Sequence, residues 1–392
     1  MSYFKNIARA VLGRPIAASK SPGFQSSKTP PPTAVGISAK LSDPSDVTSE
    51  AAIAASQPQT NTAADAPRQP KIYPSARAKR PIGIFYDELS RGINPYSQIE
   101  TCGVADVSNS IDHIVNLFNK YNIVKVRRVY SPKKSKELNQ HCIDFSGLQP
   151  REFRDVFAKR KKWATGGAPV LNDDRFWPYV SDPKIAEIVQ ALLGKDSFEF
   201  GSAVAAHYSA RGLHRDYRNL VESDASPYSV KDPQKRIIRI LHYCGISGGA
   251  LGYIPFSHNE TQFTQQSKRV GVTKTTEWFN RHRDVLTQAR LQRDFVEADE
   301  IERHVCWAYA DPGDIIISNS AMLHCGEYLI GPRYFFVSTY AENNPETINI
   351  AAGQAKTEKS REYHAYMAKR GFDGSNAVLA EAERLESLPI KA

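Results

Sequence analysis

The chain has 392 residues, of which 41% are hydrophobic, and it carries a formal net charge of +9 at neutral pH. This length suits two or three average domains, or one elaborated β-barrel domain with extensions. The five cysteines are odd in number and show no CxxC spacing, which argues against a disulfide framework or a zinc knuckle and favours a reducing compartment. No long apolar run occurs, so no membrane-spanning helix is predicted. The positive charge suits an anionic partner or an ordinary solvated surface.

The first eighty residues differ in composition from the rest of the chain. Residues 1–42 contain no acidic side chain, and residues 21–78 are rich in Pro, Ser, Thr, Ala and Gln. Such a segment buries too little apolar surface to offset the entropy of ordering, so we expect a disordered low-complexity tail over residues 1–80. The acid-free start is typical of a mitochondrial presequence and also of a disordered terminus. We expect a cytoplasmic protein, with mitochondrial targeting as the alternative.

Globular sequence begins near residue 81, and its first part alternates between helical and extended patterns. Apolar residues spaced three and four apart indicate helices, while Ser, Asp and Pro mark helix starts and Gly marks a helix end. In chain order we expect a helix over 108–121 capped by Ser108 or Ser110, a strand over 123–126, a helix from Ser131–Pro132, and a helix from Asp182–Pro183 to Gly194.

The sequence becomes rich in strand patterns after Gly194. Within residues 236–244 the side chains alternate, so that Arg239 and Leu241 share one face and Ile240 and His242 the other. Short strands separated by turns predict a β-sandwich or barrel. The expected strands cover 198–208, 236–244, 250–255, 305–309, 314–318 and 333–340, with a turn at Asp311–Asp314.

Two helix-prone segments interrupt and follow this β region. Residues 259–303 are polar and are interpreted as an insertion between strands. Residues 351–392 are mostly helical, with a break at Gly371–Gly374, and are interpreted as a C-terminal extension. The main globular domain is therefore expected over residues 81–350.

The spacing of three residues suggests a metal centre. His214 and Asp216 are two apart, and in an extended strand such residues point to one face. A third ligand from His324 would complete two histidines and one carboxylate, the ligand set of non-haem Fe(II) oxygenases. Each residue also has a structural interpretation, as a packed loop histidine or a capping aspartate. Arg333 heads the last expected strand, and its guanidinium suits a carboxylate.

The order of these motifs resembles the phytanoyl-CoA dioxygenase family over about residues 110–342. The matching features are His214-Arg215-Asp216, the run Gly249–His258, Pro312–Ile316, and then His324 and Arg333. The resemblance implies a mainly β fold with flanking helices around a double-stranded β-helix (jelly-roll) core. It also implies that His214, Asp216 and His324 bind Fe(II) and that Arg333 binds the far carboxylate of 2-oxoglutarate.

The implied activity is that of a dioxygenase that consumes O2 and 2-oxoglutarate, hydroxylates a small molecule and releases succinate and CO2. Two positions depart from the family pattern: Phe256 replaces the glycine of a Pro-Gly-Ser-His motif, and Arg215 replaces a neutral polar residue. These departures concern the substrate rather than the metal, and the net positive charge of the chain favours an anionic substrate. Tyr208 and Arg239 are weaker candidates for contacting the co-substrate.

Several alternatives remain open from the sequence. Arg215, Tyr217 and Arg218 are candidates for lining a substrate entrance, while His207, His242 and His258 are interpreted as packed or turn residues. The chain could instead be a degenerate jelly-roll binding protein that contacts an anionic partner through Lys159–Lys162. It could also be a metal-dependent jelly-roll enzyme without redox chemistry. We expect a small-molecule substrate rather than nucleic acid, and the sequence does not indicate an oligomeric state.

Overall fold

The computed structural model describes residues 94–146, 165–167, 170–206, 213–245, 249–282, 300–326 and 334–388. These residues belong to the second of two compact units, Gln69–Ala392. The expected tail over 1–80, the Lys159–Lys162 cluster, His207, Tyr208 and Arg333 lie outside the described residues and stay predictions. Among the described helices, none is both long and apolar enough to cross a membrane.

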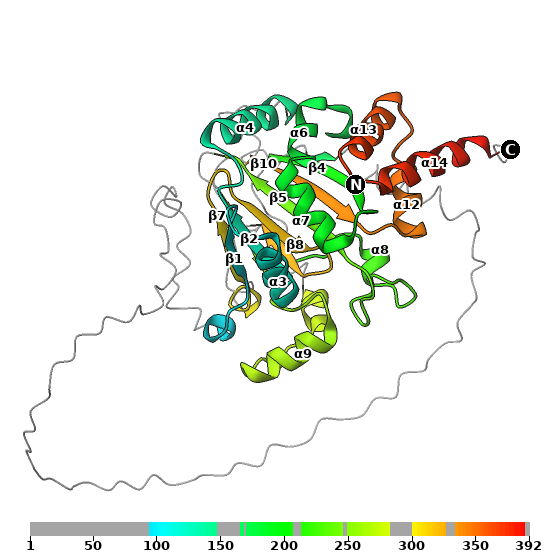
Figure 1. Ribbon diagram of the computed structural model, residues 1–392. Coiled ribbons are helices and arrows are strands. Elements are labelled where there is room, and N and C mark those ends of the chain that lie inside the picture. Colours follow the sequence, from blue (N-terminus) through cyan, green and yellow to red (C-terminus); the bar gives the residue numbers. More distant parts are fainter. Residues whose placement is uncertain are drawn as a thin grey trace, which may run out of the picture. The chain divides into compact units, whose positions relative to one another are not determined.

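Two β-sheets form the centre of this unit (Figure 1). All strand pairs in them are antiparallel except the parallel pair β1 and β2. The larger sheet has the order β1 (Gly103–Asp106), β2 (Ile123–Arg127), β8 (Ile315–Asn319), β5 (Ile237–Tyr243), β10 (Tyr334–Ala341), β4 (Phe198–Ala206) and β3 (Thr165–Gly167). The smaller sheet has the order β7 (Cys306–Ala310), β6 (Gly249–Tyr253) and β9 (His324–Gly326).

The chain passes back and forth between the two sheets. From β4 it reaches a bridge at His214 beside β9 of the smaller sheet, and it then returns to the larger sheet in β5. Strands β6 and β7 lie in the smaller sheet, β8 in the larger, β9 in the smaller and β10 in the larger. This alternation of eight segments between two facing sheets is a jelly roll. The expected fold class, a mainly β protein with flanking helices and a jelly-roll core, is confirmed.

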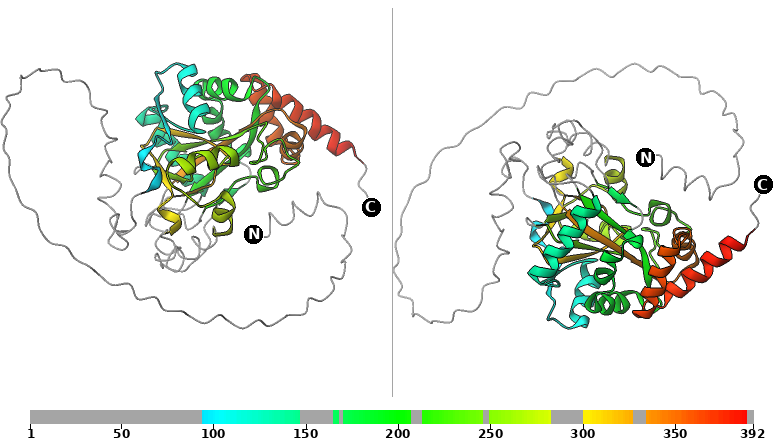
Figure 2. Two further views of the ribbon diagram at one scale, coloured as in Figure 1. Left: turned by 90° about the horizontal axis from the view of Figure 1, so that it is seen from below. Right: turned by 90° about the horizontal axis from the view of Figure 1, so that it is seen from above.

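Helices cover the outer face of the larger sheet, as the views in Figure 2 show. Phe118, Leu138 and Ile188, from three different helices, pack with Ile240 of β5 and Phe336 of β10 in one buried cluster. The described helices are η1 (Pro95–Gln98), α3 (Ile111–Tyr121), α4 (Pro132–Ser146), η2 (Val170–Asn172), η3 (Asp174–Phe176), α6 (Trp177–Val180), α7 (Pro183–Leu193), α8 (Arg218–Val221), α9 (Glu260–Arg269), α12 (Pro345–Ala352), α13 (Glu358–Lys369) and α14 (Gly374–Ser387).

Helix starts follow the capping chemistry expected from the sequence. The Ser110 hydroxyl accepts a hydrogen bond from the His113 amide, and Asp182 accepts one from Lys184. The turn before β8 also has its expected form, because Gly313 has a φ of 98° and a side chain there would meet the Tyr130 carbonyl. These local signals explain why element positions in this part of the chain are predictable.

The alternation predicted for β5 separates two environments. Ile238 and Ile240 belong to the cluster beneath the helices, whereas Leu241 and Tyr243 pack in a cluster with Leu251 of the facing sheet. Arg239 shares the inner face with Leu241 because side chains two apart on a strand point the same way. The larger sheet therefore presents Arg239 toward the space between the sheets.

The segment interpreted as an insertion contributes to a core cluster of its own. Phe263 of α9, Phe279 and Ile301 pack in one buried cluster with Leu213 and Leu323. These two leucines directly precede His214 and His324 in the sequence. The described parts of this segment, 259–282 and 300–303, therefore support both histidine-bearing segments from behind.

Candidate metal centre

His214 and His324 face each other across a short antiparallel pairing. The His214 amide donates to the His324 carbonyl at 2.9 Å, and the His324 amide donates to the His214 carbonyl at 3.0 Å. His324 also pairs with Tyr253 of β6 on its other side. The backbone of the smaller sheet thus fixes the relative position of the two histidines, whose ring centroids are 4.2 Å apart.

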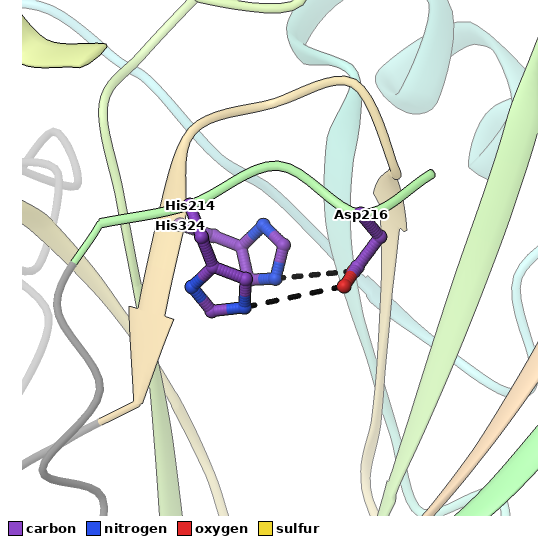
Figure 3. Close-up of side chains that lie close together, drawn as sticks. All are labelled: His214, Asp216 and His324. Carbon is purple, nitrogen blue, oxygen red and sulfur yellow. Dashed lines mark ion pairs between the residues drawn. The ribbon is translucent and has the colours of Figure 1, made fainter. Parts of the chain in front are cut away.

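Asp216 completes a group of three possible metal ligands. One ligand atom from each of His214, Asp216 and His324 can be chosen so that all lie within 4.8 Å of one another. Figure 3 shows both imidazole rings directed toward the Asp216 carboxylate. The chain leaves the sheet directly after His214, so the pair is brought together by a bend rather than by the regular strand assumed from the spacing.

The separations suit a shared metal ion. Nε2 of His324 lies 3.3 Å from Oδ2 of Asp216, and Nε2 of His214 lies 4.0 Å from Oδ1. Two ligands about 2.1 Å from one ion and at right angles to each other are about 3 Å apart. The side chains are 13%, 22% and 8% exposed for His214, Asp216 and His324, so the group is largely shielded from solvent. The types and separations of these residues therefore fit a metal ion.

The tautomer of His324 follows from its hydrogen bond. Its Nδ1 lies 2.9 Å from the Met322 carbonyl oxygen, which can only accept. Nδ1 therefore carries the proton, and the lone pair of the neutral ring is on Nε2, the atom directed at Asp216. A backbone carbonyl that holds Nδ1–H is a common way to orient a histidine ligand toward a metal.

Arg239 is the nearest cation to these groups. Its Nη1 donates to Oδ2 of Asp216 and lies 2.7 Å from Nε2 of His324. Burial disfavours the charged form of Asp216 most strongly, but the opposing interactions, of which that with the Arg239 guanidinium is the largest, together outweigh it. The pKa of Asp216 therefore lies well below its ordinary value of 3.8, and the carboxylate is ionised at neutral pH.

Arg215 does not line an entrance, so that interpretation is wrong. The side chain is 1% exposed and donates hydrogen bonds to the Ala321 carbonyl at 2.7 Å, to Oδ1 of Asn280 at 2.8 Å and to the Ser257 carbonyl at 2.7 Å. Arg215 lies between His214 and Asp216 in the sequence, but its side chain bonds to other segments and not to this group of possible ligands. Arg215 thereby ties the His214–Asp216 segment to the turn before β9 and to the insertion.

Phe256 and Ser257 form a turn after β6 that contacts the segment just before β9. Phe256 has a φ of 60°, the left-handed region that favours glycine, at the position where the resembled family has a glycine. The next residue, Ser257, accepts a hydrogen bond from the Leu323 amide at 2.8 Å through its hydroxyl, which donates to the Ile254 carbonyl. Ser257 was not singled out from the sequence, although its place after a strand and a proline is a turn signal.

Two other histidines considered from the sequence, His242 and His258, are buried in the core. His242 is fully buried on the helix side of β5, between the hydroxyl groups of Tyr130 and Ser338, and burial lowers its pKa to about 3. His258 lies in the buried turn after β6, where burial also lowers its pKa to about 3. Arg218 is exposed and pairs with Glu222. None of these three side chains is part of the three-ligand group.

Comparison with known proteins gives only distant similarities. No family model matches the chain, and no curated protein matches it. Among solved structures, HygX from Streptomyces hygroscopicus with nickel and 2-oxoglutarate bound is similar over 58% of this chain and 85% of its own, with 11% identity and a TM-score of 0.37. EctD from S. alaskensis with bound Fe is similar over 58% and 75%, with 15% identity and a TM-score of 0.35.

A third similar structure is the non-heme monooxygenase ThoJ in complex with nickel. It covers 59% of this chain and 78% of its own, with 16% identity and a TM-score of 0.35. Similarities of this size do not assign a function. The function proposed below rests on the residues of the site.

Proposed function

We propose that this protein is an Fe(II)- and 2-oxoglutarate-dependent oxygenase that hydroxylates a small molecule and releases succinate and CO2. The observation that supports it is the convergence of His214, Asp216 and His324 inside a jelly roll, with the Nε2 lone pair of His324 directed at the carboxylate. Two histidines and one carboxylate leave ligand positions free for a chelating co-substrate and for O2, which is the arrangement of non-haem iron oxygenases.

Each part of the chain has a role in this proposal. His214, Asp216 and His324 hold the iron, and the carboxylate offsets part of its charge. The low pKa of Asp216 means that no proton must be removed from it before a metal binds at neutral pH. Iron supplies the redox chemistry when it is bound, and the protein supplies a fixed three-ligand face with open positions. Arg333 remains the predicted partner of the far carboxylate of 2-oxoglutarate.

An anaerobic titration tests the proposal. Addition of Fe(II) and 2-oxoglutarate to the full chain should produce a weak visible charge-transfer band, because a chelated 2-oxo acid accepts electron density from the metal. The band should be lost in His214→Ala, which lacks one ligand. His113→Ala is the matched control, since His113 is exposed on α3, and it should retain the band.

Two results would contradict the proposal. Tight zinc binding without the Fe(II) band would favour a metal-dependent enzyme without redox chemistry. Binding of polyanions that weakens steeply with salt, with no metal binding and no succinate formation, would favour an anion-binding protein.

A further inference from the structure

Arg239 occupies an unusual position relative to the proposed ligands. It lies on the inner face of β5, its side chain is 16% exposed, and its Nη1 contacts both Asp216 and His324. A guanidinium so close to two ligand atoms competes for the electron pairs that a metal ion needs. Its presence at this position therefore requires a physical account.

Arg239 and a metal ion cannot both contact Nε2 of His324. Because Nδ1–H is held by the Met322 carbonyl, the only lone pair of the ring is on Nε2. This lone pair can accept a hydrogen bond from Arg239 or bind a metal ion, but it cannot do both. Metal binding at His324 therefore breaks the contact with Arg239, and it leaves the guanidinium with one acceptor fewer.

The neighbours of Arg239 in the sheet can form the rest of a carboxylate site. The strand register places Ser318 of β8 on one side of Arg239 and Thr339 of β10 on the other, with Gly201 of β4 next to Thr339. Both hydroxyl residues are buried, and the Tyr217 hydroxyl is hydrogen-bonded to Thr339. This row across four strands offers one guanidinium and hydroxyl donors but no acidic residue of its own.

Gly201 keeps space at the end of this row. A β-carbon there would lie 3.3 Å from the Tyr217 hydroxyl, which is tighter than an ordinary contact. Gly201 and the neighbouring inner-face residue Ala203 are only partly buried, although their strand lies between two others. Small side chains on this strand leave the inner face accessible next to the three-ligand group.

We propose that Arg239 is a carboxylate-binding residue that gives up His324 when a metal binds and then holds the carboxylate adjacent to the oxo group of the metal-bound 2-oxo acid. This inference rests on the proposed function. A guanidinium displaced from His324 is still largely shielded from water, so a further counter-charge stabilises it. The ligand carboxylate supplies that charge together with hydrogen-bond acceptors for a planar fork of donors. Asp216 and this ligand are then alternative partners of one cation.

The inference is tested by calorimetry on the full chain carrying Arg239→Gln, which measures the binding constants of Ni(II) and of 2-oxoglutarate. Ni(II), which does not turn over, should bind this variant more tightly than the wild type, by about 3- to 10-fold, because a competing donor of roughly one to two hydrogen bonds is gone. 2-Oxoglutarate should bind the nickel-loaded variant about 10- to 100-fold more weakly, the loss typical of one charge-assisted contact. Shifts in opposite directions are the signature of this role.

Pyruvate shows which of the two carboxylates of 2-oxoglutarate binds Arg239. It has only the carboxylate adjacent to the oxo group, so its affinity for the nickel-loaded protein should fall by the same factor as that of 2-oxoglutarate. Arg236→Gln is the matched control, because Arg236 begins the same strand region but bonds to Asn119 on the exterior. It should change neither constant. Arg239→Lys, which keeps the charge without the fork, should recover part of the 2-oxo acid affinity.

The outcomes distinguish this inference from the proposed function. If both constants weaken in Arg239→Gln and Arg239→Lys, Arg239 only orients Asp216 and the inference is wrong. Unchanged pyruvate affinity would also overturn it. If the nickel-loaded wild type binds neither 2-oxoglutarate nor pyruvate, the proposed function itself fails. Should Arg239→Gln not fold, as judged by circular dichroism, the same two constants measured on Arg239→Lys decide between these outcomes.

Discussion

Replacing Arg215 by methionine tests whether a buried cation holds the His214–Asp216 segment in place. The guanidinium donates to three neutral oxygens, from Ala321, Asn280 and Ser257, and among the residues that the structure describes no carboxylate is hydrogen-bonded to it. Methionine retains much of the length and apolar volume of the side chain but offers no donor. The two backbone carbonyls would then be buried without this partner, whereas the Asn280 amide can rotate.

The expected loss follows from two opposing terms. Hydrogen bonds to a charged donor contribute about 1.5–3 kcal/mol each, so three of them contribute roughly 4–9 kcal/mol. Burial lowers the pKa of Arg215 from 12.5 to about 10, which corresponds to a cost of roughly 3 kcal/mol for the charged form that methionine avoids. The free energy of unfolding should therefore fall by about 3 kcal/mol, within a range of roughly 1–6 kcal/mol.

Equilibrium unfolding in urea, followed by tryptophan fluorescence with EDTA in every sample, measures this loss without a contribution from metal. Arg218→Met is the control, because Arg218 lies three residues further, is 49% exposed in its side chain and makes a surface ion pair with Glu222. The control should lose less than about 1 kcal/mol. A loss below about 1 kcal/mol in Arg215→Met as well would refute the claim that these three bonds stabilise the segment.

Two further predictions concern buried groups outside the ligand set. Burial raises the pKa of Glu199 from 4.5 to about 7, so wild-type stability should decline from about pH 4.5 to 7, where the unfolded chain has already released the proton that the folded state keeps. In Glu199→Gln this decline in the free energy of unfolding, measured in urea across that pH range, should be about 3 kcal/mol smaller. If the dependence of stability on pH were the same in the variant, the raised pKa of Glu199 would be contradicted. Phe256→Gly should relieve about 1 kcal/mol of strain from the left-handed backbone conformation but lose about 3–5 kcal/mol from the buried ring. The free energy of unfolding, measured by thermal or urea unfolding, should therefore fall by about 2–4 kcal/mol. An increase in stability would show that the backbone strain is the larger contribution.

The sequence predicted those elements whose signals are local. The helix after Ser110, the helix between Asp182 and Gly194 and the alternation in β5 follow from caps and from side-chain period. Strands β1, β3 and β9 were not expected. Each has only three or four residues, and pairing partners distant in sequence rather than an intrinsic pattern define them. Helix α12 was missed as well, because its short apolar pattern follows the last strand directly.

The candidate site likewise combines features that a local pattern predicts with contacts that only the folded chain defines. His214, Asp216 and His324 were proposed together, and the structure brings them within reach of one ion; that they bind metal stays a proposal. The inner-face position of Arg239 followed from strand period, but its contact with His324 depends on the sheet order, which a sequence does not display. The burial of Arg215 was missed for the opposite reason, because an arginine between two site residues is ordinarily exposed.

The pairing of His214 with His324 also bears on how the chain assembles. The two residues lie far apart in the chain, and closing so long a loop costs about 4 kcal/mol of chain entropy in the unfolded ensemble. A metal ion bound by both residues, as proposed, would act as a cross-link around β5, β6, β7 and β8, much as a disulfide would. During synthesis, a nascent chain that has not yet reached β9 lacks His324. Under the proposed function, iron would therefore bind late, after most of the core strands have been synthesised.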